Sequence, residues 1–154
     1  TEIYTLSLHD ALPISSRNYI LAAYGNPTGW NFFVQCPDTL YGNQFVWQAG
    51  SDLISAALPD SVPGDGVENE YKNRWNHWAC TKNADTGLMN VYLNGSLWYT
   101  VGGRMQPIRG YLATDFTIGD HPYGMVSYKG LLDEVRIYNR VLSQAEIYLL
   151  CQQD

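Results

Sequence analysis

The chain has 154 residues, of which 45% are apolar and 16% charged, and its formal net charge at pH 7 is −6. This length suits one domain with a substantial core, and the composition excludes a disordered tail or a coiled coil. The lysines and arginines form no basic stripe and no apolar run approaches the roughly 20 residues of a membrane span, so we expect no nucleic acid partner and no membrane span.

The first segment, residues 1–15, stands apart from the rest of the chain. Residues 1–14 resemble, without a mismatch, the translation of the adapter oligonucleotide used in short-read sequencing libraries. The segment lacks the basic start of a signal peptide, and His9 and Asp10 interrupt its apolar stretch. We therefore expect residues 1–15 to be a non-native leader and residues 16–154 to be a domain that is incomplete at its N-terminus. A genuine N-terminal strand is the alternative.

The remaining chain predicts a series of short strands. Segments rich in aromatic and β-branched residues alternate with clusters of Gly, Pro, Asn and Asp. Residues 89–93 alternate apolar and polar positions, and Asn94-Gly95 is a pair favoured in tight hairpin turns. The expected strands span residues 19–23, 30–35, 44–48, 53–57, 75–82, 89–93, 97–101, 116–118 and 131–138.

The end of the chain predicts a single helix. Ser143 and Glu146 have the spacing of a capping box, and Ile147, Leu149 and Leu150 follow as an apolar face. The polar stretch 51–73, apart from the strand at 53–57, is typical of a surface loop. Many antiparallel strands with one terminal helix favour a two-sheet sandwich.

Three segments carry a family resemblance. Residues 75–81 have the pattern Trp-x-His-x-Ala-x-Thr, residues 91–95 are Val-Tyr-Leu-Asn-Gly, and residues 116–119 precede the terminal GLLDEVRIYNR of residues 130–140. In this order and spacing they resemble the laminin G-like and pentraxin-like group of concanavalin A-type jelly rolls. The resemblance implies an all-β, two-sheet antiparallel jelly-roll sandwich with one short C-terminal helix. It also implies further N-terminal strands, one of them near the terminal strand, which we do not find.

Sequence patterns for catalysis are missing. A retaining hydrolase presents two carboxylates about 5 Å apart, and the related laminarinase-type enzymes carry them in an E-x-D-x-x-E pattern that this sequence lacks. Asp65, Glu68 and Glu70 lie among Pro and Gly, as in a solvated loop. No G-x-S-x-G, H-E-x-x-H or P-loop pattern occurs. We therefore expect that the protein is not an enzyme.

Calcium is the cofactor that the resemblance implies. In related jelly rolls the aspartate of the terminal strand often helps to bind a structural Ca²⁺, and Asp133 holds that position here. The loop that contains Asp120 stands where pentraxins place calcium ligands, although only Asp120 matches their acidic set. Because Ca²⁺ takes oxygen ligands, Asp133 and Asp120 are the candidate metal ligands. The alternative for Asp133 is a hydrogen bond to a strand end or neighbouring loop.

Carbohydrate recognition needs an exposed aromatic face together with a few polar side chains. Adjacent strand residues point to opposite faces, so one of Trp98 and Tyr99 must point inward. Three other tryptophans, Trp30, Trp75 and Trp78, lie in strand patterns, and we assign them mainly to packing. The candidate ligand-binding residues are Trp98, Tyr99, Trp47, Tyr123 and Tyr128.

The three cysteines leave two alternatives open. Cys36, Cys80 and Cys151 form no C-x-x-C unit, so either one pair is bridged and the third is left over, or the thiols are free and buried.

Together these features predict a non-catalytic extracellular or cell-surface module of binding or adhesion within a larger chain. Its expected partner is a glycan or an extracellular protein. The alternatives are a structural spacer domain without a ligand and, third, a remnant of a concanavalin A-type glycoside hydrolase.

Overall fold

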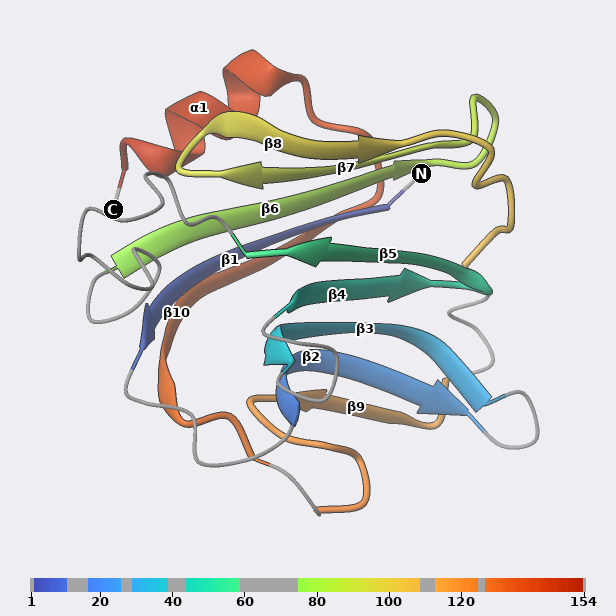
Figure 1. Ribbon diagram of the computed structural model, residues 1–154, viewed down its shortest axis with the longest axis vertical. Coiled ribbons are helices and arrows are strands. Elements are labelled where there is room, and N and C mark those ends of the chain that lie inside the picture. The colour runs from blue at the N-terminus through green and yellow to red at the C-terminus, as the bar shows by residue number, and fades with distance from the viewer. Residues whose placement is uncertain are drawn as a thin grey trace.

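The structure, a computed structural model, describes residues 2–10, 17–25, 29–38, 44–58, 75–108, 113–124 and 127–153. These residues form two five-stranded antiparallel sheets that face each other (Figure 1). Sheet A has the order β10-β1-β6-β7-β8, and its strands are β1 (Glu2–Asp10), β6 (Trp75–Asn83), β7 (Leu88–Leu93), β8 (Ser96–Val101) and β10 (Gly130–Tyr138). Sheet B has the order β5-β4-β3-β2-β9, and its strands are β2 (Arg17–Gly25), β3 (Gly29–Asp38), β4 (Gln44–Ala49), β5 (Asp52–Ala57) and β9 (Asp115–Ile118).

Every strand expected from the sequence is present, and the two-sheet antiparallel sandwich is confirmed. Alternation explains the local structure most clearly in β5, where buried and exposed residues alternate along the whole strand. Asn94 and Gly95 form the predicted turn between β7 and β8 with φ angles of 50° and 77°. The expected loop at residues 59–73, with its acidic cluster, lies outside the described residues.

Residues 2–10 form a strand, which the sequence analysis gave only as the alternative for this segment. β1 lies between β6 and β10 and pairs antiparallel with both, so it occupies the place beside the terminal strand. Its sequence alternates Tyr4, Leu6 and Leu8 with more polar residues, which is the period of a strand. The non-native origin of residues 1–15 stays a prediction, since pairing in a sheet depends on pattern and not on origin.

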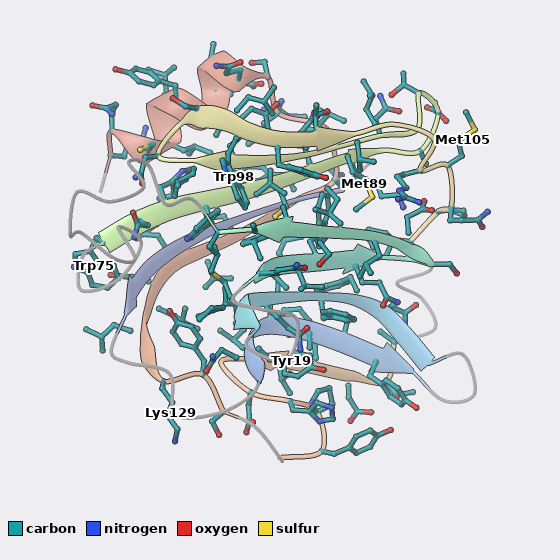
Figure 2. The ribbon with its side chains drawn as sticks, in the orientation of Figure 1. Tyr19, Trp75, Met89, Trp98, Met105 and Lys129 are labelled. Atoms are coloured by element: carbon teal, nitrogen blue, oxygen red, sulfur yellow. The ribbon has the colours of Figure 1, made fainter. Side chains whose placement is uncertain are left out.

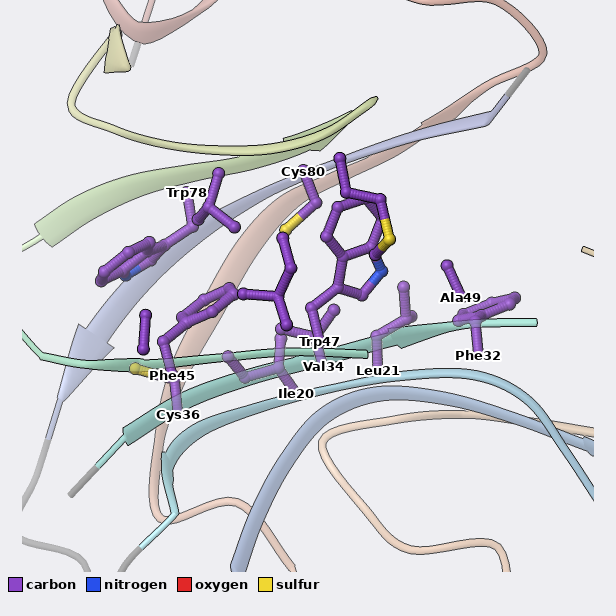
Figure 3. Close-up of a cluster of buried hydrophobic side chains, with 14 of the residues drawn as sticks. Ile20, Leu21, Phe32, Val34, Cys36, Phe45, Trp47, Ala49, Trp78 and Cys80 are labelled. Carbon is purple, nitrogen blue, oxygen red and sulfur yellow. The ribbon is translucent and has the colours of Figure 1, made fainter. Parts of the chain in front are cut away.

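The core lies between the sheets and is dominated by aromatic rings from both. Phe45 of β4 stacks on Trp78 of β6 with ring centroids 4.7 Å apart (Figure 3). Trp98 of β8 makes T-shaped contacts with both rings, with centroids 5.9 Å from Phe45 and 5.4 Å from Trp78. Aromatic pairs of this kind add about 0.5–1.5 kcal/mol each beyond the area that they bury. This cluster therefore joins sheet A to sheet B.

A buried ion pair joins the sheets at a second point. The Lys82 ammonium of β6 lies 2.8 Å from the Asp52 carboxylate of β5 and donates a further hydrogen bond of 2.6 Å to the Ala49 carbonyl. The same carboxylate oxygen accepts from the Gln106 N–H at 2.8 Å. Because both charges are buried, each depends on the other for compensation.

α1 (Gln144–Cys151) covers the face of sheet A that is turned away from sheet B (Figure 1). The predicted capping box is present, and the Glu146 pKa is lowered to about 2, mainly by the hydrogen bond from Arg140 and also by Ser143. Ile147 is fully buried, whereas Leu149 is 60% exposed, so the predicted apolar face is wrong at Leu149. At 100° per residue, Leu149 lies on the opposite side of the helix from Ile147.

In the described part of the chain, no helix is long and apolar enough to cross a membrane.

No disulfide joins the three cysteines, all of which lie in the described part of the chain. Cys36 and Cys80 are buried, and Cys151 is partly buried. Burial, and to a smaller extent the neighbouring Cys36, raises the pKa of the Cys80 thiol. The alternative of free thiols is therefore the one that the structure supports.

Two tryptophans of β6 test this account of the core. Trp78→Ala should lower the free energy of unfolding by about 3–5 kcal/mol because it removes a fully buried ring from the inter-sheet cluster. Trp75→Ala, on the same strand but 50% exposed, should cost about 1 kcal/mol or less. Urea denaturation of both variants measures the difference, and equal losses would contradict the placement of the two rings.

Candidate functional site

A cleft of about 480 Å³ opens on the face of sheet A that carries α1. Trp75 and His77 enter it from β6, and it continues over the turn between β7 and β8 to β10 and to the C-terminal end of α1. The cleft is lined by Trp75, His77, Asn94, Asp133, Glu134, Cys151 and Gln153.

Strand alternation and register bring the walls of the cleft together. Trp75, His77 and Ala79 alternate with the core residues of β6, and Ala79 is buried in the cluster under α1. His77 and Asp133 both lie opposite Ser7 of β1, one on each side of this strand. Because both residues line the cleft, it reaches from β6 to β10, and β1 lies between these two strands in the sheet.

An irregularity in β10 places two acidic side chains at the cleft. Neighbouring strand residues normally point to opposite faces, yet Asp133 and Glu134 both line it. Glu134 has a φ of 51° and lies where the register between β1 and β10 shifts, which is a bulge that redirects the side chain. Asp133 Oδ1 accepts from the Glu134 N–H at 2.8 Å, and the Glu134 carboxylate pairs with Arg136.

The hairpin turn is held against β6 by Asn94. Its N–H donates to the His77 carbonyl at 2.8 Å, and its Oδ1 accepts from the His77 N–H at 3.0 Å. The Asn94 amide also donates to Asn76 Oδ1 at 3.2 Å. These three bonds give this wall of the cleft a defined position.

The end of α1 lies close against the same turn. A Cβ atom on Gly95 would stand 3.0 Å from Tyr148 Cδ2 and 3.6 Å from the Cys151 Cβ. Only glycine fits both this approach and the positive φ of residue 95. The packing of α1 against this turn therefore places Cys151, and Gln153 two residues further on, at the edge of the cleft.

Two of the tryptophans expected to bind ligand belong to the core. Trp47 is fully buried in sheet B, and Trp98 is partly buried against Phe45 and Trp78. The expectation of an exposed face is corrected for both, because β4 and β8 turn these residues toward the opposite sheet. The prediction that one of Trp98 and Tyr99 points inward is confirmed, with Tyr99 38% exposed.

The other predicted residues lie on separate surfaces. Tyr123 is 57% exposed, and its ring lies 5.2 Å from that of Tyr24. A hydrogen bond with Tyr24 is the main cause that raises the pKa of Tyr123 to about 12. Tyr128 packs against the core and donates its N–H to the Gly119 carbonyl. Among the ligand and metal residues expected from the sequence, Asp133 alone lines the cleft.

The described residues do not assemble a calcium site. Within those ranges no group of three or more His, Cys, Asp and Glu side chains is placed to hold a metal ion. Asp120 Oδ1 accepts from the His121 N–H at 2.7 Å and from Ser127 at 3.3 Å, and Asp133 has only Glu134 as an acidic neighbour in the cleft. Ca²⁺ takes six to eight oxygens, so this donor set falls short.

Sequence reasoning missed Trp75, which it assigned to packing. Trp75 projects from the beginning of β6 at the outer face and is 50% exposed (Figure 2). The signal was available, since Trp75 and Trp78 differ by an odd number of positions and cannot both face the core of one flat strand. The sequence carries no such signal for the cleft residues that only the fold brings together, which are Asn94, Glu134, Cys151 and Gln153.

Two facing five-stranded antiparallel sheets, with a cleft on one outer face, define a β-sandwich of the jelly-roll class. Residues 10–148 match a laminin G family model described as the concanavalin A-like lectin/glucanases superfamily. The chain belongs to this family, as the resemblance implied. A search of curated proteins finds no match to this sequence.

Solved structures share the fold at low identity. A candidate carbohydrate binding protein from Bacteroides ovatus aligns with a TM-score of 0.72 and 19% identity, over 96% of this chain and 39% of that one. A SAP-like pentraxin from Limulus polyphemus aligns with a TM-score of 0.64 and 15% identity, over 97% and 69%. Domain 4 of the extracellular arabinanase AbnA from Geobacillus stearothermophilus, in complex with arabinotriose, aligns with a TM-score of 0.68 and 20% identity, over 98% and 66%. The chain thus spans well under half of the Bacteroides protein.

The close contact between the hairpin and α1 is testable at Gly95. Gly95→Ala should lower the free energy of unfolding by about 1–2 kcal/mol, because alanine is strained at a positive φ and its Cβ meets Tyr148. Gly103→Ala is the matched control, since residue 103 also has a positive φ, 72°, but a Cβ there meets nothing within 4 Å. Chemical denaturation compares the variants, and similar losses at both positions would rule out the contact.

Calcium binding at Asp133 or Asp120 stays a prediction of the resemblance. Isothermal titration of the chain with Ca²⁺ tests it: a heat of binding together with a higher Tm would support the prediction, because a ligand bound to the folded state stabilises it. The absence of both effects would refute the prediction at both aspartates.

Proposed function

We propose that the chain is a non-catalytic, extracellular carbohydrate-binding module and that the cleft on sheet A holds the sugar. The observation that carries this proposal is that the exposed ring of Trp75 lines one cleft together with amide and carboxylate side chains. A protein surface is the alternative ligand, and a structural spacer without a ligand is the alternative role.

The side chains of the cleft match what a sugar presents. A pyranose or furanose ring offers a C–H face that stacks on an aromatic side chain, and hydroxyl groups that both donate and accept hydrogen bonds. Trp75 supplies the aromatic face, the amides of Asn94 and Gln153 donate and accept, and the Asp133 carboxylate accepts. Ligand sites generally combine such a face with a few polar groups in a concavity.

Part of the cleft is positioned before any ligand arrives. Asn94 is fixed by its hydrogen bonds to His77 and Asn76, and the turn that carries it packs against α1. A rigid wall lowers the entropy lost on binding. Binding through Asn94 therefore requires little rearrangement of the turn.

The comparisons support a sugar as the ligand. One neighbour is described as a candidate carbohydrate binding protein, and another is an arabinanase domain in complex with arabinotriose. The family description names lectins and glucanases together. A sugar ligand for this chain follows these descriptions by analogy of fold, and Trp75 supplies the physical argument.

The cleft favours binding over hydrolysis. A glycoside hydrolase flanks the scissile bond with two carboxyl groups, whereas Asp133 and Glu134 are consecutive residues of β10. The Glu134 carboxylate is also paired with Arg136. The geometry thus places both acids on one wall of the cleft.

Trp75→Ala tests the proposal on a glycan array, followed by titration calorimetry with the glycan that binds best. The variant should weaken binding by about tenfold or more, equivalent to about 1.4 kcal/mol, because the stacking face is lost. Tyr99→Ala, which removes another exposed ring outside the cleft, should leave the affinity unchanged.

Two outcomes would contradict this assignment. If the folded chain binds no glycan on the array, the spacer or protein-binding alternatives take its place. If Tyr99→Ala weakens binding and Trp75→Ala does not, the module binds sugar elsewhere, on the β8 edge of sheet A.

A further inference from the structure

We infer that the cleft selects its sugars by charge, so that it accepts neutral glycans and discriminates against glycans that carry carboxylates. This inference rests on the proposed function and names the sugar class of the same site. It follows from two acidic residues that line the cleft: Glu134, which is paired with Arg136, and Asp133, which has no ion-pair partner among the described residues.

Asp133 places an uncompensated negative charge at the cleft. It is exposed, and among the described residues no lysine or arginine forms an ion pair with it. The hydrogen bond that it accepts from the Glu134 N–H engages only one of its two oxygens. The second oxygen remains an acceptor for a sugar hydroxyl. A carboxylated sugar residue at the same place would instead be repelled by the like charge of the Asp133 carboxylate.

Glu134 adds no attraction for anions. The carboxylate of Glu134 is already paired with the Arg136 guanidinium. Arg136 does not line the cleft. The pair is therefore close to neutral as a unit, and the charge that faces a ligand is set by Asp133.

The size of the effect follows from Coulomb repulsion. Two like unit charges about 4 Å apart repel by about 1 kcal/mol in water, which corresponds to about a fivefold loss of affinity. Salt at 1 M shortens the screening length to about 3 Å. The discrimination should therefore be about fivefold at low salt and should shrink toward unity at 1 M NaCl.

The test uses pairs of glycans that differ only in a carboxylated residue, such as oligosaccharides with and without a terminal sialic acid, on one array. The unsubstituted chain should bind the neutral member of each bound pair about fivefold better in low salt. Asp133→Asn should bring the ratio close to one, while the amide retains the oxygen that accepts from the Glu134 N–H.

Asp85→Asn is the matched control. It changes the net charge by the same amount at an exposed position in the turn between β6 and β7, at the opposite end of β6 from Trp75. This variant should keep the fivefold preference. If it relaxes the preference as much as Asp133→Asn, the effect belongs to the net charge of the chain and the inference fails.

The remaining outcomes separate the inference from the function on which it rests. If carboxylated glycans bind as well as their neutral partners or better, charge selection is refuted while glycan binding stands. If no glycan of either kind binds, both proposals fall together. A preference that is unchanged at 1 M NaCl would also overturn the inference, because a steric preference is insensitive to salt.

Discussion

The contact of Phe45 with Trp78 across the sandwich fixes the orientation of β6, and the outer surface of sheet A follows from it. Because the rings stack at 4.7 Å, the face of β6 that carries Trp78 must point to sheet B. Trp75 and His77, which alternate with the core residues along β6, must then point to the other face of sheet A, where the cleft lies. Packing in the core and exposure at the cleft are thus two consequences of one alternation, and a shift of β6 by one residue would exchange them.

Local patterns in the sequence were sufficient for most elements of the fold. The Asn94-Gly95 turn and the capping box at Ser143 depend on neighbouring residues alone, and both occur as predicted. Which face of a strand points inward is a different kind of information, because it depends on the partner sheet. Trp47 is an exception: Phe45, Trp47 and Ala49 share one face of β4 while the glutamines lie on the other, so alternation alone indicates that Trp47 faces the core.

The site was harder to predict because its parts meet through register. His77 and Asp133 come to line one cleft because both pair with Ser7 of β1, a strand in the segment that the sequence analysis predicts to be a non-native leader. The bulge at Glu134 is equally invisible in the sequence, since its motif is that of a regular terminal strand. Asp133 was nevertheless found, because the family resemblance marks its position, and the structure places that residue in the same cleft as Trp75.

The two roles considered for Asp133 have opposite electrostatic consequences, which allows one to be distinguished from the other. A bare carboxylate at the cleft repels acidic sugars, whereas a divalent cation is the largest local charge at any site it occupies and reverses that sign. A module that used Asp133 to hold Ca²⁺ would therefore gain affinity for carboxylated glycans when calcium is added. A module that uses the free carboxylate would keep its preference for neutral glycans with or without the ion. The sign of the charge preference thus reports on the state of Asp133 itself.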